Sequence, residues 1–105
     1  MTPKKPSKEI QERIVQAVLK GVFPDLAAQC EGIDNKTLLE WMQRGESESS
    51  GPFHDFYHAV IKADDEVVSR LIHVIQESAK TDFRAAAYLR KLKIDPRYAQ
   101  YFHEP

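Results

Sequence analysis

Apolar residues in the first part of the chain recur every three or four positions, which is the period of one face of an α-helix. The pattern predicts a first helix over about residues 8–20, preceded by Ser7 as its N-cap and followed by Gly21. A second helix is predicted over about residues 24–30, because Pro24 suits the first turn of a helix. The apolar positions of the first helix are Ile10, Ile14, Ala17 and Val18.

Residues 28–41 have the spacing of a helix-turn-helix, a unit whose second helix many proteins place in the DNA major groove. Ala28 is small enough for two helices to cross closely. Gly32 permits the left-handed backbone of a tight turn, and Ile33 fills the corner between the helices. Cys30, in the same unit, is predicted to face its core.

The second helix of this unit is predicted over about residues 35–44. Asp34 is its expected N-cap, since its carboxylate can accept from the first backbone N–H groups of the helix. Leu38 and Trp41 lie three positions apart and are expected on the buried face. Gly45 is expected to end the helix.

Residues 46–52 (E-S-E-S-S-G-P) contain no apolar residue and are predicted to form a linker. A long helix is predicted after it, over about residues 53–80, because apolar or small residues recur there in a pattern close to a heptad seam. The remaining chain is too short to cover this stripe alone, so self-association is expected. The stripe consists of Phe53, Phe56, Val60, Ala63, Val67, Leu71, Val74 and Ser78.

A last helix is predicted over about residues 82–92, with Thr81 as its N-cap and the Asp95-Pro96 pair as its stop signal. The sequence therefore predicts an all-α fold of about five helices. An N-terminal helix-turn-helix bundle is expected first, and a long and a short helix follow as an oligomerisation hairpin.

This pattern predicts three regions: a DNA-binding domain over residues 1–45, the linker over 46–52, and a self-association region over 53–105. The formal net charge of −1 is unevenly distributed along the chain. Residues 45–79 carry a net charge of −5, while residues 80–105 carry +3. One copy is expected to bind DNA weakly, because non-specific affinity comes from neutralised phosphates.

The chain contains no apolar run long enough to cross a membrane, so no membrane association is expected. Its basic N-terminus lacks the apolar region of a signal peptide. A single cysteine fits a reducing compartment, and a cytoplasmic location is therefore predicted.

The candidate DNA-binding residues lie on the face of the third helix opposite Leu38 and Trp41. Asparagine and glutamine can read adenine there, and lysine and arginine can contact guanine or phosphate. A solvated surface on a unit used only for packing is the alternative. Lys4 and Lys5 are candidates for a phosphate-contacting arm, or form an ordinary tail. The candidates on the helix are Asn35, Lys36, Leu39, Glu40, Gln43 and Arg44.

No catalytic, metal or cofactor site is expected. His54 and His58 have a spacing that can bind zinc on a helix, but a structural site needs four ligands, so both are expected to be surface histidines. The serines of the linker have no neighbouring base, and the glycines are too scattered for a phosphate-binding loop. The chain is therefore not expected to be an enzyme.

Three segments together resemble the terminase small subunits of tailed bacteriophages and prophages: Ala27–Gly45, G-P-F-H-D-F-Y-H-A-V-I-K-A (Gly51–Ala63), and T-D-F-R-A-A-A-Y-L-R-K-L-K-I-D-P-R-Y (Thr81–Tyr98). The resemblance implies a protein that binds the packaging site on double-stranded DNA and assembles into rings through the helices after the linker. It also implies delivery of the DNA to a terminase large subunit, which carries the ATPase and nuclease activities, in the bacterial host cytoplasm.

Two other functions remain open. One is a dimeric helix-turn-helix regulator or a transposase-type accessory protein. The other is a protein-interaction adaptor that does not touch DNA. The basic residues of the last helix and tail fit a second DNA surface, a docking surface for the acidic segment of a neighbouring subunit, or simple solubility; they are Lys80, Arg84, Arg90, Lys91, Lys93 and Arg97.

Overall fold

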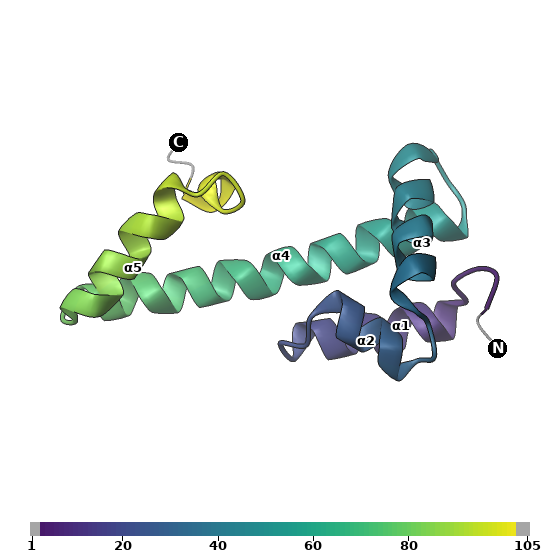
Figure 1. Cartoon of the computed structure of the whole chain (residues 1–105), viewed down its shortest axis with the longest axis horizontal. Coiled ribbons are helices and arrows are strands. Elements are labelled where there is room, and N and C mark those ends of the chain that lie inside the picture. The colour runs from purple at the N-terminus through teal and green to yellow at the C-terminus, as the bar shows by residue number, and fades with distance from the viewer. Residues whose placement is uncertain (1–2, 103–105) are drawn as a thin grey trace. The chain divides into compact units, whose positions relative to one another are not determined.

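The chain is helical, as the apolar periodicity predicts. The computed structural model describes residues 3–102, and within them it contains no strand (Figure 1). The all-α prediction is confirmed. The outermost residues of the predicted terminal regions, 1–2 and 103–105, lie outside the described residues. The elements are α1 (Lys8–Leu19), α2 (Pro24–Cys30), α3 (Asn35–Ser47), α4 (Pro52–Ala79), α5 (Phe83–Ile94) and a short 3-10 helix, η1 (Ala99–Phe102).

Side-chain caps fix the starts of α1 and α3. The Ser7 hydroxyl accepts a hydrogen bond from the backbone N–H of Ile10 at 3.1 Å. The Asp34 carboxylate accepts one from the backbone N–H of Thr37 at 2.8 Å. Each bond satisfies a donor that has no partner within the helix, so both predicted N-caps are confirmed.

At α5 the cap is one residue later than predicted. Asp82 accepts from the backbone N–H of Arg84 at 2.8 Å, so the prediction of Thr81 is wrong. A carboxylate at this position also interacts favourably with the positive end of the helix dipole. The helix then ends at Ile94, directly before the predicted Asp95-Pro96 stop.

The turn between α2 and α3 has the predicted backbone. Gly32 has φ +79°, in the left-handed region that favours glycine. The N–H of Ile33 reaches back to donate to the carbonyl of Ala28 at 3.0 Å. Ile33 itself is 1% exposed, so it fills the corner as expected.

Cys30 does not face the core, contrary to the prediction, because its side chain is exposed. Ala27 and Ala28 take the two buried positions of α2. Cys30 comes two residues after Ala28. At 3.6 residues per turn this is a rotation of about 200° around the helix axis, so Cys30 lies on the opposite side.

Gly45 does not end α3, contrary to the prediction. The helix continues to Ser47, and Gly45 is buried within it. A Cβ atom on Gly45 would lie 2.3 Å from the carbonyl oxygen of Phe53 and 2.3 Å from the Cβ of Tyr57. Glycine therefore occupies this position because the backbone of α4 passes directly against it.

The chain divides into two compact units, Met1–Val67 and Val68–Pro105, and the division falls inside α4. The predicted linker over residues 46–52 is shorter in the structure, since only residues 48–51 separate α3 from α4. The first half of α4 belongs to the same unit as α1, α2 and α3.

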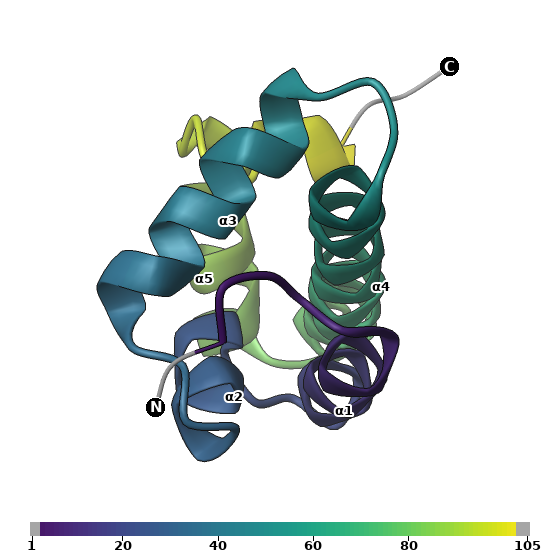
Figure 2. The ribbon, with the colours of Figure 1, turned by 90° about the vertical axis from the view of Figure 1, so that its right-hand side faces the viewer.

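In the first unit, α1 and α3 lie next to the first turns of α4, and α2 lies against α1 and α3 (Figure 2). Trp41 of α3 packs edge-on against two rings of α4, with centroid distances of 6.5 Å to Phe53 and 5.5 Å to Phe56. Ile14 and Val18 of α1 belong to the same buried cluster. The core therefore joins all four helices.

This packing splits the predicted stripe of α4 into two parts. Its first half, with Phe53, Phe56, Val60 and Ala63, is buried in the core of the first unit. The expectation that the chain cannot cover this stripe is therefore wrong for the first half. In the second half, Leu71 and Val74 are 58% and 60% exposed.

The second unit contains the last turns of α4, then α5 and η1. Its buried apolar residues, among those described, are Ile72 and Leu92. Lys93 places its ammonium 5.8 Å from the ring centroid of Phe102, between α5 and η1. Within residues 3–102, no helix is both long and apolar enough to cross a membrane.

Candidate nucleic-acid interface

The two sides of α3 differ sharply in burial. Leu38 and Trp41 are 5% and 3% exposed and face the core. The Asp34 cap and the turn at Gly32 fix where the helix starts. The opposite side carries five of the predicted DNA-binding residues, all of them exposed: Asn35, Lys36, Leu39, Glu40 and Gln43.

Within this exposed face, residues four positions apart form two neighbouring rows along the helix. Asn35, Leu39 and Gln43 form one row. Lys36 and Glu40 lie in the second row, and no ion pair joins them in the described part of the chain. The face thus presents two amides, an apolar side chain, one cation and one anion to solvent.

Arg44, the sixth predicted residue, is held at the junction of α3 and α4. Its Nε donates to the Glu48 carboxylate at 2.7 Å, in an ion pair. Its guanidinium carbon lies 3.9 Å from the centroid of the Phe53 ring, a cation–π contact. These two contacts orient Arg44 at the junction of α3 and α4, while its side chain remains 60% exposed.

Asp34 is committed to capping α3. Hydrogen bonding by Thr37, through its side chain and its backbone N–H, lowers the pKa of Asp34, so this carboxylate stays ionised at neutral pH. Together with Glu40, it sets two carboxylates against the ammonium group of Lys36 on this side of α3. Lys36 is the cation of this face that has no ion pair among the described residues.

Lys4 and Lys5, the predicted arm, are both exposed, whereas the adjacent Pro6 is buried. Because Pro6 is buried, it holds this end of the arm against the first unit, and the arm is therefore not a freely moving tail. Neither lysine forms an ion pair within residues 3–102. Both ammonium groups therefore remain available for phosphate.

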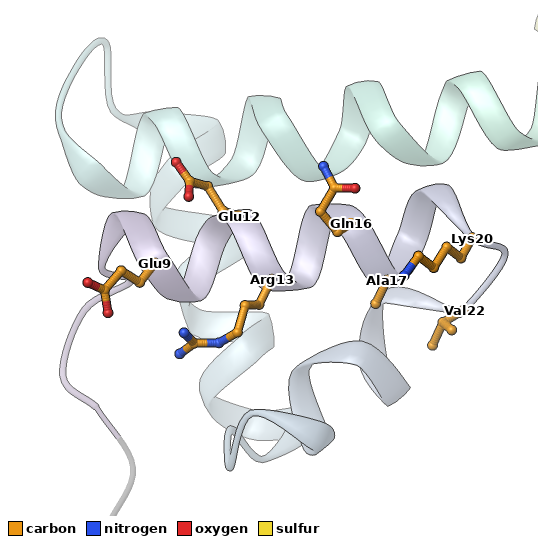
Figure 3. A pocket seen from close by; sticks show the side chains of 7 residues that line it. All are labelled: Glu9, Glu12, Arg13, Gln16, Ala17, Lys20 and Val22. Atoms are coloured by element: carbon orange, nitrogen blue, oxygen red, sulfur yellow. The ribbon is translucent and has the colours of Figure 1, made fainter.

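A shallow hollow lies along α1, with Ala17 and Val22 as apolar members and charged side chains around them (Figure 3). Arg13 leaves the helix on the side opposite Glu12 (Figure 3). It pairs with Glu31, which raises the pKa of Arg13. This bond ties α1 to the turn before α3, so the hollow contains no converging set of free groups.

The histidine pair on α4 has one carboxylate beside it, that of Asp55. The rings of His54 and His58 are 4.3 Å apart between centroids, and His54 Nδ1 lies 3.2 Å from the Asp55 carboxylate. No group of three or more potential metal-binding side chains is found in the described residues.

The outer face of α5 combines apolar and basic side chains. Phe83 and Ile94 are 86% and 79% exposed, and a hollow between them includes Ala86 and Ala87. Helix α5 contains no acidic residue and ends at Ile94, two residues later than the predicted end at Leu92. The helix predicted over residues 82–92 excludes Ile94, although its spacing of eleven from Phe83, about three helical turns, is a usable signal.

Comparisons of the chain with protein-family models, with curated proteins and with solved structures found no match.

Proposed function

We propose that this protein binds double-stranded DNA through a helix-turn-helix formed by α2 and α3, as the small subunit of a phage terminase. The observation that carries the DNA-binding part is the two-sided character of α3. One side is buried through Leu38 and Trp41, and the other presents exposed amide, lysine and apolar side chains. A capped helix that follows a short left-handed turn and has this division suits insertion into the major groove.

The chemistry of the exposed face supports reading of bases more than strong attraction to phosphate. Amide side chains at Asn35 and Gln43 match the donor and acceptor pair of adenine, and Lys36 can contact phosphate or guanine. Glu40 repels phosphate, and Arg44 is held by Glu48. Each copy is therefore expected to bind weakly, so several copies would act together on one DNA site.

The packaging role rests on the sequence resemblance of residues 51–63 and 81–98. In this role the protein assembles with itself in the host cytoplasm and delivers DNA to a large subunit. Leu71 and Val74 on α4, with Phe83 and Ile94 on α5, supply exposed apolar surface for such assembly.

A titration of DNA binding against salt tests the DNA-binding proposal. Fluorescence anisotropy with a mixed-sequence duplex should show affinity falling between about 50 mM and about 200 mM salt. Lys36→Ala should lower the slope of log K against log salt by about one for each copy bound. Lys62→Ala, an exposed lysine on α4, is the matched control and should leave the slope unchanged. Binding that is absent at all salt concentrations would favour the adaptor.

The solution mass separates the terminase function from the regulator. Light scattering behind a sizing column should give one species of many subunits if a closed ring forms. A dimer that prefers a two-fold symmetric DNA site would favour the regulator. If the acidic and basic segments of neighbouring copies meet, raised salt should reduce the mass.

A further inference from the structure

An apolar side chain stands in the middle of the polar face of α3. Leu39 is 54% exposed, and it has no place in the buried cluster of the first unit. Asn35 lies one turn before it and Gln43 one turn after it, both exposed. A leucine in this position buries its side chain only when something docks on the face.

The length of this row matches a short stretch of DNA. Asn35 and Gln43 are eight residues apart, which is about 12 Å along a helix. At about 3.4 Å per base pair, this distance covers three to four base pairs. A helix lying along the major groove could therefore bring all three side chains to base edges at once.

The three side chains match the chemistry of A·T pairs. Adenine presents an acceptor and a donor that an asparagine or glutamine amide can bond together, and thymine presents a methyl group. A G·C pair opposite Leu39 would instead leave polar base atoms without hydrogen-bond partners against an apolar side chain, which is unfavourable.

We propose that Asn35, Leu39 and Gln43 together select an A·T-rich run of three to four base pairs, with Leu39 in contact with a thymine methyl group. This inference rests on the DNA-binding function proposed above and adds the class of sequence that is bound. Lys36, in the neighbouring row, contacts the phosphates that flank the run.

The experiment uses the full-length protein and duplexes with a randomised centre. Duplexes that bind are selected, sequenced and resynthesised with uracil replacing one thymine at a time, which removes only the methyl group. The selected sites should be rich in A·T pairs. One substitution should weaken binding about fourfold, the factor expected for one buried methyl group. Substituting 7-deazaadenine at the flanking adenines should weaken binding roughly 5- to 150-fold.

Truncating each of two leucines with similar exposure tests whether Leu39 makes the contact with the thymine methyl group. Leu39→Ala should bind the thymine and uracil duplexes equally. Leu71→Ala removes an exposed leucine from α4, which is 58% exposed against 54% for Leu39. It should keep the fourfold ratio even if a change in assembly alters its absolute affinity. Thermal melting checks that both variants are folded.

Each outcome decides the question. Salt-dependent binding to G·C-rich sites, or binding that no uracil substitution weakens, would overturn the inference and leave DNA binding in place. A Leu39→Ala variant that keeps the thymine preference would do the same. If no duplex binds at any salt concentration, the proposed function fails and the inference fails with it. The uracil test on the unaltered protein needs no variant to fold.

Discussion

Replacing Gly45 with alanine should destabilise the protein, although the same change stabilises most helices. In the interior of an exposed helix, alanine is favoured over glycine by about 1 kcal/mol. Gly45 lies inside α3 with its backbone in the ordinary helical region, so propensity alone predicts a gain. The close approach of α4 predicts the opposite sign.

The magnitude follows from the contacts of the added methyl group. It would lie 2.3 Å from the Phe53 carbonyl oxygen and 2.3 Å from Tyr57 Cβ, about 1 Å inside the 3.4 Å at which ordinary contact begins. Neither atom is the far end of a flexible side chain, so α3 and α4 must move apart. Overpacking of this kind costs about 1–3 kcal/mol or more. Because two contacts are about 1 Å too close, we take the upper end of this range, and after the gain in helix propensity we expect a net loss of about 2 kcal/mol.

Urea and thermal unfolding followed by circular dichroism measure this change. Glu46→Ala, at the exposed neighbouring position of α3, is the matched control and should alter stability little. Gly45→Asn tests whether Gly45 is needed for close packing or as a C-terminal helix cap, because asparagine is tolerated at a left-handed C-terminal position. The packing explanation predicts that Gly45→Asn is at least as harmful as Gly45→Ala. A Gly45→Ala variant as stable as the original protein would refute the close approach of the two helices.

Three further changes test other parts of the structure. Trp41→Ala should lower the free energy of unfolding by about 3–5 kcal/mol in urea titrations, because it leaves a cavity against Phe53 and Phe56; a loss below 1 kcal/mol would contradict its burial. Desolvation raises the pKa of Asp64, with a smaller contribution from the charge of Asp65, so ionised Asp64 destabilises the fold. Protonated Asp64 does not carry this cost, so the fold is more stable in acid and loses that stability as the pH rises through the folded-state pKa of Asp64. Asp64→Asn should therefore raise Tm at neutral pH and lose this advantage in acid, and an advantage independent of pH would point to another cause. Cys30 should react with a thiol reagent in the native protein nearly as fast as in urea, whereas strong protection would contradict its exposure.

The sequence predicts those features that depend on neighbouring residues along the chain. The caps Ser7 and Asp34 accept from N–H groups three positions later, and the turn at Gly32 is also local. The same periodicity places Leu38 and Trp41 inside and the candidate DNA-binding face outside.

The errors concern features that depend on distant residues or on a finer use of the helical period. Gly45 looks like a stop signal until Phe53 and Tyr57 are seen to lie against it. The contacts of Arg44 with Glu48 and Phe53 also depend on residues outside the local pattern, and its contact with DNA stays a prediction. Cys30 was predictable in principle, since its position relative to Ala27 and Ala28 already places it on the outer side of α2.

The burial of the start of α4 in the first unit affects the order in which the protein can fold during its synthesis. Of the eleven buried residues of that core in the described chain, the last four in sequence, from Phe53 to Ala63, belong to α4. At about 5–20 residues per second, a ribosome needs roughly 1–4 s to add residues 46–63. Until Phe53 and Phe56 have been added, Trp41 has no aromatic partners, and the core against which α3 packs is incomplete until Ala63. The nascent chain therefore exposes a large apolar surface for seconds, and a fragment that ends at Gly45 should aggregate or remain unfolded.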